Sequence, residues 1–281
     1  MMTHLRCKTA AAFVSPLALV LAASLLLATA AQAQAPKPPA DQDAEYAACL
    51  DMAKKKPEAA LERAKKWWDS GGNIGPRHCI AVALIAQENY VQAGKILEDL
   101  ANDAKPEVAS LRGDLFNQAG QAYYLAGNFD KAIPLYTQAL LTKPRDVDFL
   151  IDRAVARDEF GQHFEAIDDL NLAIEIAPDR PEAWLYRANA YRHVNSLDLA
   201  LEDAERAVTL SKHSPEALLE RATIKSLRKD SAGARADLQT IVKLAPKSIQ
   251  GQEAAKRLKA TPAAPAKPSA TPAKPAPQKP N

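Results

Sequence analysis

The sequence predicts an all-α protein, a solenoid of about six helix pairs that ends in a single capping helix. Three observations carry this prediction. Small residues recur at fixed places every 34 residues, a large apolar residue recurs at another place of the same period, and proline stands near the end of most repeats. One helix pair of this length cannot bury its own apolar stripe, so the pairs must stack on one another.

The four clearest repeats are residues 113–146, 147–180, 181–214 and 215–248. Small residues at the eighth and twentieth places let the two helices of a repeat approach closely: Gly120, Ala154, Ala188 and Ala222, then Ala132, Ala166, Ala200 and Ala234. A large apolar residue at the fourth place fills the space between repeats: Phe116, Leu150, Trp184 and Leu218. Pro178 is expected to stop a second helix, and Pro181 to open the next first helix.

Two weaker repeats precede these, at residues 41–73 and 74–107. Alanine again holds the small-residue places, as Ala48 and Ala60 in the first of them and Ala81 and Ala93 in the second. About five extra residues before Gly113 predict a longer linker or a helix extension near residues 102–110. Residues 250–260 predict one polar helix that caps the stack.

These repeats resemble the tetratricopeptide repeat, a helix–turn–helix unit of this length. The resemblance covers residues 41–260 and is most specific over residues 113–248. It implies a right-handed α-α superhelix whose inner, concave face forms a groove. It also implies that the protein binds other proteins or peptides.

In the tetratricopeptide family, the stripe of first-helix places beside the core lines the groove. Here that stripe holds amides, tyrosines and charged residues: Asn117, Gln121, Tyr124, Asp148, Asp152, Asp158, Tyr186, Asn189 and Arg192. Such a mixture suits an extended peptide backbone, and a merely solvated groove is the alternative. It does not match the lysine–asparagine clamp by which chaperone-binding relatives hold a C-terminal carboxylate, so that class of partner is not expected.

Two charged series keep the period of the repeats. The seventh place holds Arg153, Arg187 and Arg221, and the twenty-third holds Asp169, Asp203 and Asp237. The shared period predicts that each arginine meets an aspartate across packed helices, as a ladder of partly buried ion pairs. A stripe that binds an anionic ligand is the alternative.

Residues 1–33 have the order of a bacterial secretory signal peptide: a basic start, an uncharged apolar run, and Ala31-Gln32-Ala33 as the cleavage site. An uncleaved membrane anchor is the alternative, because the run is long enough to span a bilayer. We expect a soluble protein that is exported to the periplasm and has no integral membrane segment after cleavage. A Pro-rich linker is expected at residues 34–40, and a disordered Ala/Pro/Lys-rich tail at residues 261–281.

Cys49 and Cys79 are the two cysteines that follow the signal peptide. The resemblance places them on the first helices of neighbouring repeats, near one another on the inner face. An exported protein meets a compartment that permits disulfides, so a disulfide between them is favoured. Two free buried thiols and a metal site that includes His78 are the alternatives.

The sequence gives little support for catalysis. It lacks a glycine-rich phosphate loop, a zinc-binding histidine pair on one helix and a nucleophile elbow. His78, His163, His193 and His213 are scattered over three repeats with no shared spacing. No catalytic residue, cofactor or metal is therefore predicted. Lysine and arginine number 36 against 34 acidic residues, without the concentrated basic face of a nucleic-acid-binding protein.

The leading hypothesis is a non-catalytic scaffold or adaptor in the periplasm that holds a protein segment in the groove. The alternative is a structural or assembly factor of the cell envelope that acts through the convex face and the Pro/Lys-rich tail. The oligomeric state is not predicted.

Overall fold

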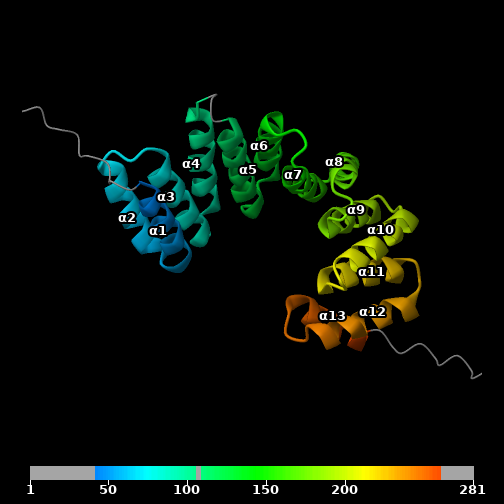
Figure 1. The fold of residues 1–281 in the computed structure, drawn as a ribbon. Coiled ribbons are helices and arrows are strands. Elements are labelled where there is room, and N and C mark those ends of the chain that lie inside the picture. Colours follow the sequence, from blue (N-terminus) through cyan, green and yellow to red (C-terminus); the bar gives the residue numbers. More distant parts are fainter. Residues whose placement is uncertain (1–41, 106–108, 261–281) are drawn as a thin grey trace, which may run out of the picture. The chain divides into compact units, whose positions relative to one another are not determined.

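The computed structural model describes residues 42–105 and 109–260, which form thirteen α-helices (Figure 1). The first helices of the pairs are α1 (Gln42–Lys55), α3 (Ile74–Ala86), α5 (Ala109–Leu125), α7 (Val147–Glu159), α9 (Pro181–His193) and α11 (Pro215–Leu227). The second helices are α2 (Pro57–Asp69), α4 (Tyr90–Asp103), α6 (Phe129–Thr142), α8 (His163–Ile176), α10 (Leu197–Leu210) and α12 (Ser231–Leu244), and α13 (Ile249–Ala260) follows them. The predicted fold class, all-α with consecutive helix pairs and one further helix, is confirmed.

The helices pack in chain order. Each one contacts the next, and successive first helices from α5 to α11 also contact one another, as does α11 with α13. This is the contact pattern of a solenoid, in which each repeat is stabilised mainly by its neighbours. The predicted signal peptide, linker and tail, residues 1–33, 34–40 and 261–281, lie outside the described residues.

Local sequence explains where these helices begin. The helices α9 and α11 begin at Pro181 and Pro215, where the missing N–H of proline costs no intrahelical hydrogen bond. The hydroxyl of Ser214 accepts a hydrogen bond from the Ala217 N–H and caps α11. The extra residues before Gly113 are partly a helix extension, because α5 begins at Ala109.

The small residues at the eighth and twentieth places lie where helices touch. Ala154, Ala166, Ala188 and Ala200 are completely buried. At Gly120 a Cβ atom would lie 2.8 Å from the ring of Tyr136, so even an alanine would displace that ring. The close approach of the two helices in this repeat therefore depends on glycine.

The predicted ladder of ion pairs is present and joins the two helices of three successive repeats. Each arginine donates two hydrogen bonds to the carboxylate 16 residues later, with N–O distances from 2.6 to 2.9 Å, in the pairs Arg153–Asp169, Arg187–Asp203 and Arg221–Asp237. The three aspartates are buried. Because these carboxylates are occupied by arginine of the same repeat, the ladder stabilises the repeats and does not form a stripe for anions.

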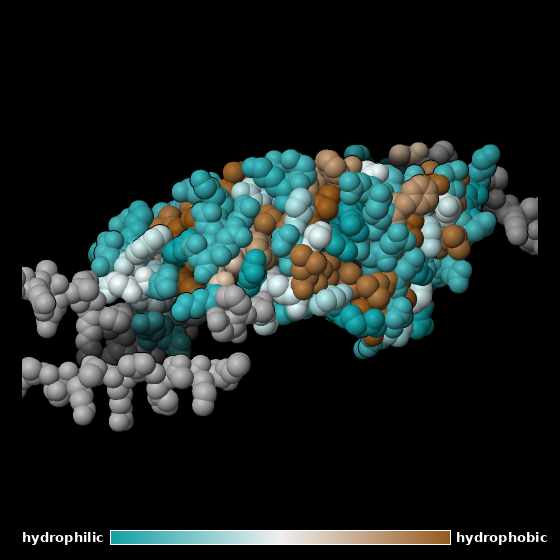
Figure 2. Space-filling view, turned by 90° about the horizontal axis from the view of Figure 1, so that it is seen from above, coloured by the Kyte–Doolittle hydropathy of each residue, from teal (hydrophilic) through white to brown (hydrophobic). Residues whose placement is uncertain are grey.

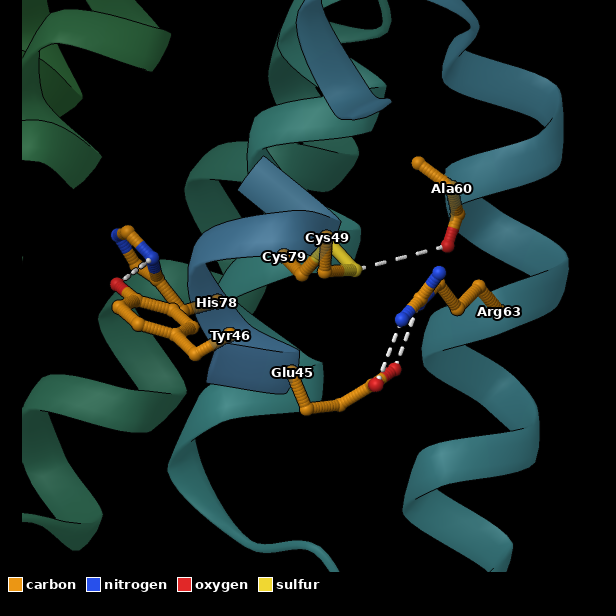
Figure 3. The surroundings of a disulfide bond; sticks show 7 residues. All are labelled: Glu45, Tyr46, Cys49, Ala60, Arg63, His78 and Cys79. Atoms are coloured by element: carbon orange, nitrogen blue, oxygen red, sulfur yellow. Dashed lines mark hydrogen bonds and ion pairs between the residues drawn. A yellow bond between two sulfur atoms is a disulfide. The ribbon is translucent and has the colours of Figure 1, made fainter. Parts of the chain in front are cut away.

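A disulfide joins Cys49 of α1 to Cys79 of α3, with 6.1 Å between their Cα atoms, and so the predicted link is confirmed (Figure 3). His78 takes no part in a site with these cysteines, because its Nδ1 bonds to the Tyr46 hydroxyl at 2.7 Å and its Nε2 to Gln118 at 2.6 Å. Burial lowers the pKa of His78, so its imidazole is neutral at neutral pH. The metal-site alternative at His78 is therefore wrong.

The face drawn in Figure 2 is mostly hydrophilic, and its hydrophobic residues form small separate patches. This agrees with a core that lies between the helices, where alanine, leucine and aromatic side chains are buried. Within residues 42–105 and 109–260, no helix has the length and apolar character needed to cross a membrane.

Candidate functional site

Three connected depressions follow the first helices of the repeats, and we refer to them together as the groove. The first depression, 320 Å³ in volume, lies between α5, α7 and α9; the second, 120 Å³, adjoins it; the third, 420 Å³, lies between α9, α11 and α13. Tyr186 lines all three of them, which makes the groove continuous. Of the residues that the sequence assigns to the groove, the structure places these along it: Gln121, Tyr124, Asp152, Asp158, Tyr186, Asn189 and Arg192.

A single carboxylate, Asp152 of α7, lines the first depression. Its Oδ2 accepts a hydrogen bond of 2.9 Å from the Asn117 amide and one of 2.7 Å from the Gln121 amide, both donated from α5. Burial raises the pKa of the Asp152 carboxyl, and these two amide hydrogen bonds offset part of the rise. Among the described residues, no lysine, arginine or histidine forms an ion pair with Asp152.

The position of Asn117 corrects the sequence interpretation. Its place in the repeat suggested a side chain available to a bound peptide, but Asn117 is buried. Its amide instead orients the Asp152 carboxylate, with Gln121 as the second donor. Asn117 therefore supports the groove from beneath and does not line it.

Aromatic and aliphatic side chains form the walls around Asp152. They are Tyr124, Tyr136, Tyr186, Leu125, Ile151 and Val155. Tyr124 packs against Phe129 with 5.4 Å between ring centroids, which restricts its ring. Burial raises the pKa of all three tyrosine hydroxyls, so these groups stay neutral at neutral pH. The first depression thus combines a carboxylate with aromatic surfaces, an arrangement that suits a cation.

The third depression is lined by charged residues that are already partly neutralised. Arg192 donates hydrogen bonds of 2.6 Å to Glu220 and 2.7 Å to Asn189. Arg257 donates to Glu253 and to Thr223. Arg192, which the sequence suggested as a contact for a partner, therefore mainly organises the wall of the groove.

The net charge of the groove is negative. Five carboxylates line its three depressions: Asp152, Asp158, Glu159, Glu216 and Glu220. Two arginines, Arg192 and Arg257, also line it, and both are engaged with acidic side chains of the chain itself. An acidic surface of this kind attracts basic segments and disfavours a C-terminal carboxylate.

Sequence reasoning missed a side-chain cluster beside the groove. It treated His163 and His193 as unrelated, but the structure brings their rings to 4.8 Å between centroids, and both rings form a hydrogen bond with the carboxylate of Asp158. The two histidines occupy different places of their repeats, so the period of 34 contains no signal that pairs them.

A fourth depression, of 590 Å³, lies on the second helices α4 and α6 and is lined largely by charged and amide residues. It contains none of the residues that the sequence assigns to a binding surface. Its acids, Glu98 and Asp130, are accompanied by Lys131, whose amine lies 5.2 Å from the centre of the Tyr123 ring. The groove is therefore the stronger candidate site.

Comparison with known proteins identifies the repeat. Residues 117–181 match the family model described as "Tetratricopeptide repeat". The heat-shock protein cognate co-chaperone sgt12 of Aspergillus fumigatus is 34% identical over 84 residues, which cover 30% of this chain and 25% of that protein. The mitochondrial import receptor subunit TOM70 of Mus musculus is 29% identical over 134 residues, covering 45% of this chain and 22% of that protein. The chain therefore spans about a quarter or less of these curated relatives.

Solved structures show the same fold. MamA of Desulfovibrio magneticus RS-1 aligns with a TM-score of 0.55 at 16% identity, covering 64% of this chain and 98% of that one. MamA of strain AMB-1 aligns with a TM-score of 0.51 at 19% identity, covering 60% of this chain and 99% of that one. The tetratricopeptide repeat is a non-catalytic scaffold for protein interactions. The chain thus resembles tetratricopeptide repeat proteins: residues 117–181 match the model of that repeat, and the helix pairs share the fold of these solved structures.

Proposed function

We propose that this protein is a scaffold or adaptor that binds an extended segment of another protein in the groove, and that the segment places a lysine or arginine side chain against Asp152. The uncompensated Asp152 carboxylate is the observation that carries this proposal. A carboxylate that is mostly removed from water without a cationic partner is costly, and a bound cation would recover that cost.

The walls of the first depression support the same occupant. Long basic side chains bury an apolar stem as well as a charge, and Ile151 and Val155 offer surface for such a stem. The rings of Tyr124 and Tyr186 offer faces to a guanidinium or ammonium group. The remaining acids of the groove extend the negative potential toward α11, which favours a segment with further basic residues.

The test begins with affinity capture of the partner from a cell-envelope extract. Binding is then measured for synthetic peptides of the captured protein in which each arginine is replaced in turn by citrulline and each lysine by norleucine. Asp152→Asn removes the charge and keeps an oxygen that accepts from Asn117 and Gln121, so the fold should persist. We expect Asp152→Asn to weaken peptide binding at least ~10-fold, about 1.4 kcal/mol. The matched control is Asp148→Asn. Asp148 lies one turn earlier on α7 and its side chain is 69% exposed, so this substitution should change peptide binding little.

The pH dependence gives an independent readout. A cationic side chain is held only by the ionised carboxylate, so binding should be lost as the pH falls through the pKa of Asp152. Because burial raises that pKa, the loss should begin at a higher pH than ionisation of an exposed aspartate predicts. Asp152→Asn should abolish this dependence. A peptide whose citrulline and norleucine variants all bind as tightly as the parent would contradict the role of Asp152.

Truncation after Ala260 distinguishes binding in the groove from the alternative function, in which the tail carries the contacts. It removes the Pro/Lys-rich tail and leaves the described helices through α13 intact, so capture of the partner should be unchanged if the groove binds it. Loss of the partner on truncation, together with full capture by Asp152→Asn, would favour the cell-envelope assembly factor that acts through the tail.

We also propose that the protein is exported to the periplasm. The signal-peptide pattern of residues 1–33 supports export, and the Cys49–Cys79 disulfide is of a kind that persists in oxidising compartments. N-terminal sequencing of the exported protein should begin at Gln34. Retention of Met1 or Met2 would instead indicate an uncleaved anchor.

A further inference from the structure

Three potential metal ligands meet where three helices end or begin. Asp158 lies one residue before the end of α7, His163 is the first residue of α8, and His193 is the last residue of α9. The three helices follow one another in the stack (Figure 1). The turn between α7 and α8 contains Gly161 at φ +86°, a conformation that glycine adopts without strain and that returns His163 toward Asp158.

The geometry of the three side chains is compact. The Nδ1 of His163 lies 2.6 Å from Oδ1 of Asp158, and the Nδ1 of His193 lies 3.0 Å from Oδ2 of the same carboxylate. One ligand atom of each side chain lies within 4.8 Å of the other two. A tetrahedral zinc site with bonds of about 2.0–2.1 Å separates its ligands by roughly 3.3 Å. Small side-chain rotations would therefore bring the three ligands to metal-binding distances.

The surroundings of the cluster favour a cation. Asp158 and His193 both lie in the last turn of their helices, where the C-terminal end of the helix carries a partial negative charge that attracts a cation. His163 lies at the N-terminal end of α8, whose partial positive charge cancels part of that attraction. The side chains of His163, His193 and Asp158 are 29%, 34% and 13% exposed. An ion can thus reach the cluster from solvent, and the carboxylate is shielded enough to attract it.

We propose that Asp158, His163 and His193 form a binding site for a divalent transition-metal ion of the zinc class, with the remaining coordination position open to water. Two imidazoles and one carboxylate are a ligand set for zinc and its neighbours, whereas magnesium and calcium prefer oxygen ligands alone. Each histidine loses a hydrogen bond to Asp158 when the ion binds, and the ion replaces both of these hydrogen bonds.

The site has a structural consequence that does not depend on the proposed function. The ion would link the two helices of residues 147–180 to α9 of the following repeat. Asp158 also lines the second depression of the groove, so the proposed metal site lies at the edge of the groove. Metal binding would therefore stiffen the contact between two repeats next to the surface where a partner is proposed to bind.

The experiment uses the exported protein without an affinity tag. Zn²⁺ binding is measured by calorimetry, and Co²⁺ is used as a spectroscopic substitute whose visible absorption strengthens when the ion passes from water into a four-coordinate protein site. The variants are His163→Gln and His193→Gln, and circular dichroism verifies their helix content. The matched control is His213→Asn, which removes an exposed histidine elsewhere and suits the left-handed backbone at that position, φ +69°.

We expect the wild-type protein and His213→Asn to bind Zn²⁺ equally and to give the same Co²⁺ spectrum. Each cluster variant should bind at least ~10-fold more weakly and lose the spectrum, because a ligand is removed. If either histidine variant fails to fold, Asp158→Asn takes its place with the same expectation. Equal Zn²⁺ binding by the cluster variants and the wild type, or no binding by the wild type, would overturn the proposal and leave the cluster a set of hydrogen bonds.

Discussion

Reduction of the Cys49–Cys79 disulfide is expected to lower the free energy of unfolding of the N-terminal helices by about 3–4 kcal/mol. The bond closes a loop between residues 30 apart, which restricts the unfolded chain. It also compensates for a weak core. The buried cluster that surrounds the disulfide consists of alanine and cysteine side chains: Cys49, Ala53, Ala60, Ala64, Cys79 and Ala83. Small side chains bury little apolar area, so the disulfide contributes much of the local stability.

Hydrogen exchange can measure this effect helix by helix. With the disulfide reduced, α1 and α2 should exchange faster, whereas α7 to α12 should change little, because solenoid repeats are stabilised mainly by their neighbours. The matched control is the Cys49→Ala/Cys79→Ala double variant, which should resemble the reduced protein and show no response to reductant. Identical exchange of α1 and α2 before and after reduction would contradict the prediction, as would the absence of a Cys49–Cys79 cross-linked peptide.

Replacement of Arg187 by alanine is expected to lower the free energy of unfolding by about 3 kcal/mol. Arg187 is the only cationic partner of Asp203 among the described residues, whereas Asp169 and Asp237 each have a second one, Arg157 and Lys225. The substitution therefore leaves the Asp203 side chain, which is 5% exposed, without a counter-charge. It also removes the stacking of the guanidinium on Trp184, whose ring centre lies 5.0 Å away.

Thermal and chemical unfolding of a variant series would test this expectation. The double variant Arg187→Met/Asp203→Leu removes both charges and should recover most of the loss, because no buried charge remains unpaired. Arg145→Ala breaks an exposed pair with Glu175, whose side chains are 64% and 68% exposed, and should change stability by less than about 0.5 kcal/mol. A loss at Arg187 no larger than that at Arg145 would show that the ladder does not stabilise the repeats.

The repeat period explains why so much of the fold could be predicted. A feature that recurs every 34 residues occupies the same position in each helix pair, so the partner of one arginine predicts the partner of the next. This reasoning placed the ladder and the completely buried alanines, such as Ala166 and Ala200. The resemblance to the tetratricopeptide repeat also predicted that Cys49 and Cys79 lie near one another, and the disulfide between them confirms this.

The candidate sites depended on contacts that no period describes. Asp152 receives hydrogen bonds from Asn117 and Gln121, 35 and 31 residues earlier, so the three residues do not share one repeat place. From the sequence, all three were equivalent members of a polar stripe. Only the packing of α5 against α7 buries Asn117, leaves Asp152 in a depression and determines which side chain is available to a partner.

The same distinction applies to the metal-ligand cluster. Repetition in the sequence determined the helix pairs, their small-residue contacts and the ion pairs within each repeat, because those contacts recur. The tertiary structure alone decided the meeting of Asp158, His163 and His193, since their contact arises once, where the end of α9 packs beside the turn between α7 and α8. A contact that occurs in only one repeat leaves no periodic signal, and its partners are set by how the helix ends pack in space.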